Sequence, residues 1–305
     1  MAISKNLWLN GTIQKLGGAV AYNLKGQQIL RKEAAKVANP RTTAQMDQRV
    51  KLANLVNFYR ANKAWMAKGA FESKKQTWSD YNAFVSANLE GNNIYLSKSQ
   101  ASEGQCVLAP YIVTKGTLPS ISQGKTGSGN SSKYNLYYSA SEAPTTWGAL
   151  STALIATYPG IQNGDQFSLI EFSQSSNDGK YYIVVSPFEK NLDTTSEELL
   201  SAVLPDYSFD VDTMGLDVGT EAMGVVACFS RSVGGSIKVS TQSVIAFNDA
   251  AIALFSGDSA LATAIASYGG SSVNFLDNGT TGLSSSAGDS QSGGSGAGDP
   301  GDVTP

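Results

Sequence analysis

The chain has 305 residues, of which 41% are hydrophobic, 15% are charged and none is histidine. The lack of histidine excludes Ser-His-Asp and Cys-His catalysis, and no apolar run approaches the ~20 residues that a membrane-spanning helix needs. The formal net charge of −3 hides an uneven distribution. Residues 1–75 hold 14 of the 22 Lys and Arg against three acids, a net charge of +11, whereas residues 76–305 hold eight basic and 22 acidic residues, a net charge of −14. We therefore expect the basic end to meet an anionic partner, either nucleic acid or an acidic protein surface.

The first part of the chain predicts a β-hairpin followed by two helices. Residues 13–35 contain two short apolar runs on either side of a turn, which is typical of a hairpin. Thr42 with Gln45 fits a capping box, and apolar residues then recur at helical spacing to about Lys68. A second, shorter helix is expected over residues 79–88. An isolated hairpin is marginally stable, so this one needs another surface to lie on.

After Asn92 the sequence predicts short strands, turns and inserted helices. The fold class is therefore α+β: an N-terminal β-hairpin plus helices, then a mainly antiparallel β domain with inserted helices and a disordered C-terminal tail. Residues 119–133 are also expected to form a disordered polar loop. The predicted domains are a basic docking segment at 1–90, an antiparallel-sheet domain at 91–277 and the tail at 278–305. The expected strands are 94–96, 105–114, 134–138, 166–172, 181–186, 224–230 and 236–246, with hairpin turns at 177–180 and 234–235 and helices at 146–157, 196–203, 249–255 and 259–267.

Cys106 and Cys228 each lie in an apolar run and are expected to be buried thiols, with a disulfide left open as the alternative. No Cys-x-x-Cys pair or cysteine cluster predicts structural zinc. Residues 1–5 lead into polar sequence without the apolar stretch of a signal peptide, so we expect a protein made and soluble in a cytoplasm.

The basic end offers a candidate site for an anionic partner. Aromatic residues are interleaved with its charges, as in proteins that stack single-stranded nucleic acid. The alternative is an amphipathic helix whose rings belong to the core and whose charges face solvent. The candidate anion-binding residues are Arg31, Lys32, Lys36, Arg41, Arg49, Lys51, Arg60 and Lys63.

Two other segments partly match known binding motifs. Gly124-Lys125-Thr126 lacks the first glycine of a phosphate-binding loop, because position 119 is proline, and we interpret it as a solvated loop. Asp210, Asp212, Gly215 and Glu221 fit positions one, three, six and twelve of a calcium loop. Met214 occupies position five, where an oxygen ligand is expected. Ca²⁺ held by Asp210, Asp212 and Glu221 is a weaker hypothesis than an exposed acidic loop, and no other cofactor is expected.

Several stretches resemble a known group of proteins. They are LGGAVAYNLKGQQILR with NPRTTAQMDQRVKLANLVNFYR, WSDYNAFVSANL with CVLAPYIVTKGTLPSI, and FSRSVGGSIKVSTQSVIA. Together they resemble uncharacterised proteins of Bacteroidetes and of their tailed phages, including crAss-like phages, over most of residues 13–246. The resemblance implies a virion component with no assigned catalytic residues.

These observations lead to two hypotheses. The first is a non-enzymatic structural protein of a tailed-phage virion, in the head decoration, neck or tail. It would be attached through its basic N-terminal segment to other virion proteins, would form a homo-oligomer within the particle, and would reside in the host cytoplasm before assembly. The alternative is a nucleic-acid-binding protein that uses residues 1–75. Neither hypothesis involves a membrane.

Overall fold

The computed structural model describes residues 2–3, 15–16, 19–24, 27–32, 43–72, 74, 78–127, 131–218 and 223–269. The chain divides into two compact units, residues 1–41 and residues 42–305, and each is described by itself. The domain boundary expected near residue 90 falls inside the second unit. The expected tail at 278–305 lies outside the described residues.

The first unit is a small antiparallel sheet built on the predicted hairpin. Its strands follow the order β1-β4-β3-β2. Strands β3 and β4 pair from Ala19↔Lys32 to Leu24↔Gln27, so the hairpin prediction is confirmed. The four strands are β1 (Ala2–Ile3), β2 (Lys15–Leu16), β3 (Ala19–Leu24) and β4 (Gln27–Lys32).

The second unit opens with the two predicted helices. Helix α1 (Thr43–Met66) ends before Gly69, whose φ of +105° lies in the region that favours glycine. Helix α2 (Asp80–Asn88) begins at Ser79, whose side-chain oxygen accepts from the backbone N–H of Asn82 at 3.3 Å. The expected cap at Thr42 lies outside the described residues. Three further helices are α3 (Lys98–Ser102), α6 (Asp249–Leu254) and α7 (Gly257–Ser267).

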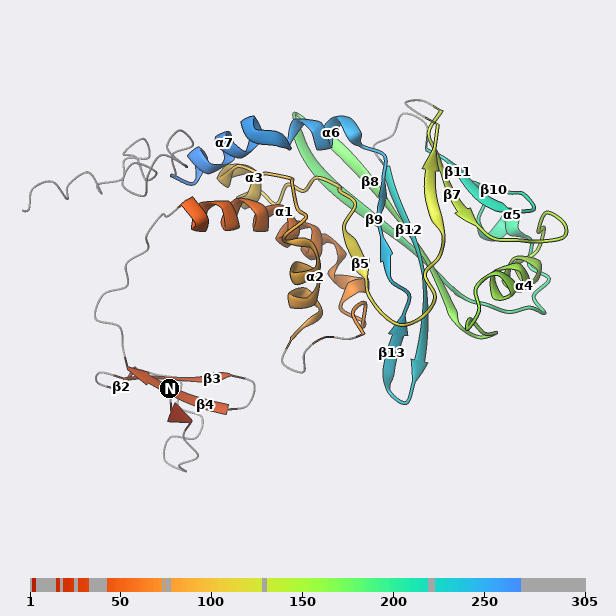
Figure 1. Cartoon of the computed structure of the whole chain (residues 1–305), viewed down its shortest axis with the longest axis horizontal. Helices are drawn as coiled ribbons and strands as arrows, with labels where there is room; N and C mark the ends of the chain where they lie inside the picture. The colour runs from red at the N-terminus through yellow and green to blue at the C-terminus, as the bar shows by residue number, and fades with distance from the viewer. Residues whose placement is uncertain are drawn as a thin grey trace, which may run out of the picture. The chain divides into compact units, whose positions relative to one another are not determined.

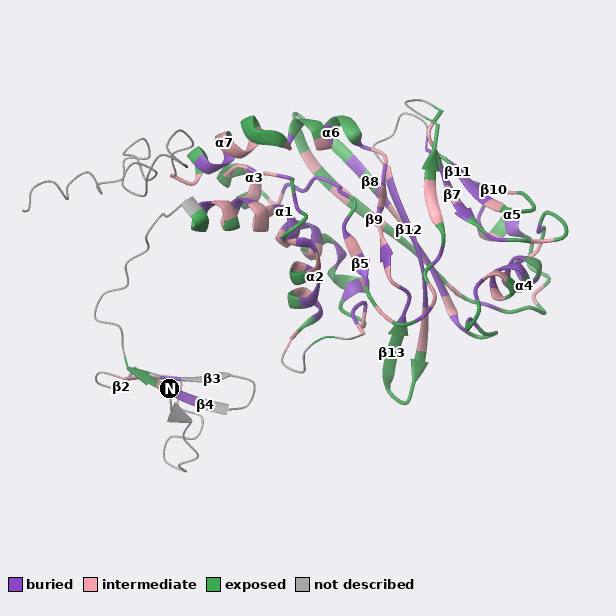
Figure 2. Ribbon diagram, in the orientation of Figure 1, coloured by how far each residue is buried: buried purple, intermediate pink, exposed green. Residues whose placement is uncertain are grey.

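The main sheet of the second unit is antiparallel, with the order β13-β12-β8-β9 and β15 paired to β12. Both hairpin turns are confirmed: Asn177 pairs with Lys180, and Val233 pairs with Ser236. Figure 2 shows β12 buried along most of its length while β13 is largely exposed. The strands are β8 (Gln166–Asn177), β9 (Lys180–Asn191), β12 (Met223–Val233), β13 (Ser236–Val239) and β15 (Ile245–Ala246).

A second sheet has the order β10-β11-β7-β6. The prediction of a disordered loop over residues 119–133 is wrong, because Gln123 to Thr126 pair with Leu136 to Lys133. Residues 128–130 lie outside the described part. The expected helix at 196–203 is shorter than predicted. The elements are β6 (Gln123–Thr126), β7 (Lys133–Tyr137), β10 (Tyr207–Phe209) and β11 (Thr213–Asp217), with helices α4 (Trp147–Thr157) and α5 (Leu200–Val203).

Both faces of the main sheet are buried, which makes the second unit a three-layer structure (Figure 1). On one face, Ile170, Phe172 and Val226 pack with α1 and α2. On the other face, Phe167 and Leu169 pack with the second sheet and α4. The alternation follows from the two-residue period of a strand, so each strand supplies both cores.

The segment between α2 and β5 (Ile112–Thr114) departs from the prediction. Strands were expected at 94–96 and 105–114, but only residues 112–114 form one, paired with β14 (Gln242–Ser243). Residues 105–109 are buried and irregular, and side-chain amides supply several of their hydrogen bonds. Asn54 bonds both the N–H and the C=O of Val107 at 2.8 Å, and Asn57 donates to the C=O of Gln105 at 2.8 Å.

Candidate partner-binding surface

The structure divides the predicted anion-binding residues among several places. Arg31 and Lys32 are exposed on β4 in the first unit, and Lys36 and Arg41 lie outside the described residues. On α1, Arg49 is half-buried and Lys51 forms an ion pair with Asp47 at 2.9 Å. The remaining two, Arg60 and Lys63, are exposed.

Arg60 and Lys63 form the basic part of α1 that is open to a partner. They are three residues apart, so their side chains are neighbours on one helix face. Neither makes a salt bridge with another residue in the described ranges. Lys68, two residues beyond the helix end, extends the basic face and lies 3.8 Å from the Glu189 carboxylate.

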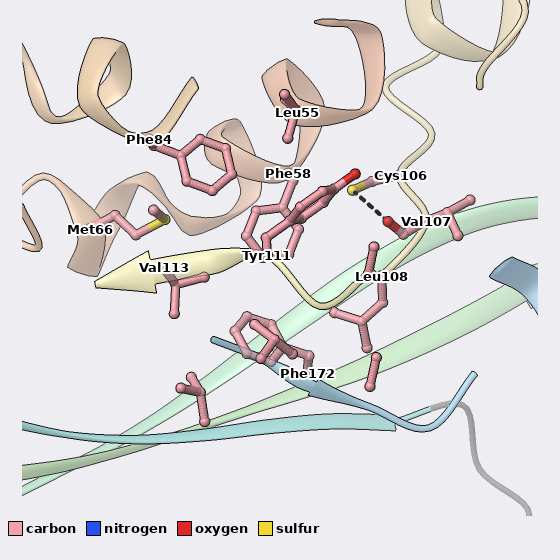
Figure 3. Packing of buried hydrophobic residues seen from close by; sticks show 14 of the residues in the cluster. Leu55, Phe58, Met66, Phe84, Cys106, Val107, Leu108, Tyr111, Val113 and Phe172 are labelled. Carbon is pink, nitrogen blue, oxygen red and sulfur yellow. Dashed lines mark hydrogen bonds between the residues drawn. The ribbon is translucent and has the colours of Figure 1, made fainter. Parts of the chain in front are cut away.

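Two aromatic rings of α1, those of Phe58 and Tyr59, pack against other aromatic rings of the core. Phe58 stacks on Phe84 with ring centroids 5.7 Å apart and meets Tyr111 and Phe172 at 5.1 and 5.8 Å (Figure 3). Tyr59 packs edge-on against Tyr81 at 5.2 Å. Phe58 and Tyr59 therefore follow the amphipathic-helix interpretation, and they are not free to stack on bases. Trp65 of the same helix is half-buried at the edge of this core.

A groove of about 400 Å³ lies between α1 and the edge strand β9. We call it the α1–β9 groove. The helix side contributes Ala61, Ala64 and the half-buried Trp65, whose Nε1 donates to Asn62 at 2.9 Å. Small side chains on the helix leave the space open, and Lys68 and Glu189 are the charged residues of its lining. The lining residues are Ala61, Ala64, Trp65, Lys68, Val185, Pro187 and Glu189.

The strand side of the groove is protected from pairing with another strand. The carbonyl of Tyr181 points away from β8 and accepts from the N–H of Cys106 at 2.8 Å. Pro187 lies six residues further along β9, so its backbone faces the same outer edge as that of Tyr181. Proline has no N–H, and this edge therefore lacks a hydrogen-bond donor at residue 187. Proline at such a position blocks the addition of a strand. A partner in this groove must therefore bind through side chains.

Next to the groove lies a smaller cavity of about 130 Å³ with both polar and apolar lining residues. The sheet register places Glu189, Ser168 and Cys228 side by side on its floor. Thr114 also lines it, and its buried hydroxyl has no hydrogen-bond partner among the described residues. This volume and lining suit ordered water.

Both cysteines are buried and free, which confirms the expectation of buried thiols. Burial, with the Glu189 carboxylate nearby, raises the pKa of Cys228 to about 12. Burial likewise raises the pKa of Cys106. Both thiols therefore stay protonated at neutral pH, whereas a nucleophilic cysteine needs a thiolate.

The predicted calcium residues flank a tight turn between β10 and β11. Asp210 and Asp212 are exposed, and Met214 is buried in β11. The backbone carbonyls of residues 210, 211 and 212 accept hydrogen bonds from the Tyr138 hydroxyl, the Ala140 N–H and the Tyr138 N–H at 2.6, 2.8 and 2.9 Å. Glu221 lies outside the described residues, so the calcium hypothesis stays a prediction. In the described ranges no three His, Cys, Asp or Glu side chains gather as a metal site.

Residues 11–176 match the model of a family of unknown function, DUF6266, over more than half of the chain. The chain belongs to the DUF6266 family. The matched region contains α1 with Arg60 and Lys63 and ends near the tip of β8. No curated protein and no solved structure matches the chain. Within the described ranges, no helix combines the length and apolar character that a membrane crossing requires.

Proposed function

We propose that this protein is a non-enzymatic structural component of a tailed-phage virion, attached through its basic N-terminal segment to an acidic protein surface. The exposed basic face of α1, formed by Arg60 and Lys63, carries the proposal. Arg60 and Lys63 lie open to a partner, while Phe58 of the same helix is fully buried against Phe84. A surface of this kind favours an acidic protein partner over unstacked bases.

The virion assignment rests on the resemblance to phage-encoded proteins. Low charge and abundant neutral polar residues suit a particle component. The test is electron microscopy and infectivity of particles from a phage that lacks this gene. We expect a missing density or a defective particle. Particles that keep every density and infect normally would refute the virion role.

The attachment surface has its own test. A phage that carries Arg60→Glu with Lys63→Glu should incorporate less of this protein into purified particles, because the reversed charges repel an acidic neighbour. The matched control is Lys98→Glu on α3, whose exposed side chain lies elsewhere. Equal incorporation of all three forms would show that attachment uses another surface.

The alternative function is nucleic-acid binding through residues 1–75, which the net charge of +11 favours. Binding driven by counterion release weakens steeply as salt rises. The full chain should then retain single- or double-stranded DNA at low salt and release it as salt increases. A chain that retains neither form of DNA at low salt would exclude this alternative.

A further inference from the structure

A second groove, of about 510 Å³, lies along helices α6 and α7. We call it the α6–α7 groove. Its lining includes the large side chains of Tyr95, Tyr181, Leu254 and Phe255, and α7 contributes small ones such as Ala260. Pockets of about 300–1,000 Å³ enclose drug-sized molecules, so this groove has room for two or three large apolar side chains.

The walls of the α6–α7 groove are held by contacts of their own. The ring of Tyr181 meets that of Phe255 edge-on, with centroids 5.1 Å apart, and the N–H of Tyr95 donates to the C=O of Phe255 at 2.9 Å. Helix α7 lies beside α3 (Figure 1), and the Ser267 hydroxyl accepts from the N–H of Lys98 at 2.9 Å. A site that is already formed loses little conformational freedom on binding.

The groove leaves apolar surface uncovered. Leu254 is 62% exposed, more than any other large apolar side chain among the described residues. Tyr95 and Tyr181 are only half-buried. Removing such surface from water is favourable, so the groove suits an apolar occupant.

The sequence that follows α7 offers an occupant of this kind. Residues 270–305 lie outside the described residues, and their sequence is mostly Gly, Ser, Thr, Asn and Asp. The large apolar residues of this stretch are Val273, Phe275, Leu276, Leu283 and Val303. Three of these five fall together at 273–276, a few residues beyond the end of α7.

This apolar segment can reach the groove from the end of α7. Gly269 has a φ of +85°, and a glycine in this conformation ends a helix and turns the chain off its axis. Residues 270–273 span up to about 14 Å when extended. Thr263 and Ala260 line the groove and lie about 6 and 10 Å along the axis before the last helical residue, Ser267. A chain that runs back along the helix therefore brings residues 273–276 to these side chains.

We propose that the α6–α7 groove receives residues 273–276 of the same chain. Phe275 and Leu276 cover Leu254 and the two tyrosines. The short linker gives this segment an effective concentration on the order of millimolar, so it takes the groove ahead of a free partner or of the same segment from a second copy. The inference goes beyond the proposed function and does not depend on it.

Cleavage of the full chain by chymotrypsin after Phe275 tests the proposal. Proteolysis at a site that opens and closes rapidly follows the fraction of open molecules. The rate at which the 276–305 peptide is released, followed by mass spectrometry, therefore measures docking. Leu254→Ser removes an exposed side chain of the groove and should raise this rate on the order of tenfold. The matched control is Leu199→Ser, before α5, which removes a side chain that is 56% exposed and should leave the rate unchanged.

A second variant blocks the groove instead of trimming it. Ala260→Phe fills the space from α7 and should speed cleavage as Leu254→Ser does, whereas Ala262→Phe, outside the groove lining, should not. Thermal melting checks that every variant is folded. Equal cleavage rates for the wild type and for folded Leu254→Ser and Ala260→Phe would overturn the inference. So would concentration-dependent association in sedimentation velocity that Leu254→Ser abolishes, because it would assign the groove to a second copy.

Discussion

At the scale of single residues, buried side-chain amides take the place of strand partners. Asn88 bonds both the N–H and the C=O of Ile112, at 2.8 and 2.9 Å, as Asn54 does for Val107. Gln174 accepts from the N–H of Leu108 at 3.1 Å. Buried backbone groups need partners, and here the helices and a strand provide them from their side chains. The apolar run at residues 105–114 predicts a strand, because the amides that replace strand partners lie far away in the sequence and leave no local pattern.

Asn54→Ala should lower the free energy of unfolding by about 3 kcal/mol, because it strips hydrogen bonds from both backbone groups of Val107 and from the Tyr111 hydroxyl. Urea denaturation measures the change. The control is Asn82→Ala on the exposed face of α2, which should stay within about 0.5 kcal/mol of the wild type. A loss below about 1 kcal/mol for Asn54→Ala would mean that water replaces the amide.

Cys228 gives a prediction for alkaline pH. Its pKa rises from 9.0 in a free thiol to about 12 in the folded chain, so the folded state holds its proton more tightly than the unfolded state. The stabilising effect is complete below pH 9 and is lost as the pH rises toward 12, at up to about 1.4 kcal/mol per pH unit.

The measurement is the free energy of unfolding of the wild type and of Cys228→Ser at several pH values from about 8 to about 11. Serine does not titrate in this range, so the variant should lose stability less steeply above pH 9. Equal slopes for the two proteins would show that the thiol is not protected by burial in solution.

At the scale of elements, local signals predicted the parts that depend on neighbouring residues. The sequence Asn177-Asp178-Gly179-Lys180 predicted a hairpin turn because Asp and Gly tolerate positive φ. In the structure Asp178 and Gly179 have φ values of 50° and 73°. Strand β6 was missed because its residues are polar and partly exposed, and among the described strands it pairs with β7 alone. This strand forms because β7 offers it backbone partners, and its sequence has no alternation of apolar and polar residues from which a strand could be predicted.

Arg231 on β12 fixes the loop that follows α4. Its Nε and Nη2 bond the two oxygens of the buried Asp165 carboxylate, each at 2.5 Å, and Nη2 also donates to the C=O of Gly160 at 2.7 Å. Arg231→Ala leaves that carboxylate without its cation and should cost about 3 kcal/mol. Arg231→Lys should recover only part of the loss, because an ammonium cannot make the two parallel bonds.

Chemical denaturation of both variants checks this prediction. Lys180→Ala serves as the control, because it breaks an ion pair with Glu103 that lies in solvent, and it should change stability little. If Arg231→Lys proves as stable as the wild type, the two-bond geometry is unimportant to the loop.

At the scale of the whole molecule, the sequence predicted half of the candidate surface. Helical periodicity placed Arg60 and Lys63 on a solvent face and the rings inside, and the structure agrees. The other wall of the groove comes from Val185, Pro187 and Glu189 on β9, far along the chain. Only the packing of α1 across the main sheet brings these walls together, and no local pattern encodes that packing.

The division into two units predicts that residues 42–305 fold without residues 1–41. The second unit contains both large hydrophobic cores, whereas the first has 41 residues, close to the size of about 40 at which domains need outside support. Calorimetry should give the 42–305 fragment the melting temperature of the full chain, and the isolated 1–41 peptide should show no cooperative transition. A fall of more than about 4 °C for the fragment would mean that the first unit supplies at least about 1 kcal/mol to the second.

The same fragment separates the two functional hypotheses. It keeps Arg60 and Lys63 on α1, so a phage that carries only residues 42–305 of this protein should still incorporate the fragment into purified particles. It loses seven basic residues and one acid, a charge of +6 out of the +11 on residues 1–75. Nucleic-acid binding through that segment would therefore weaken and show a smaller salt dependence, because fewer counterions are released. Unchanged incorporation into particles with diminished DNA retention is the result that would place the two activities on different parts of the chain.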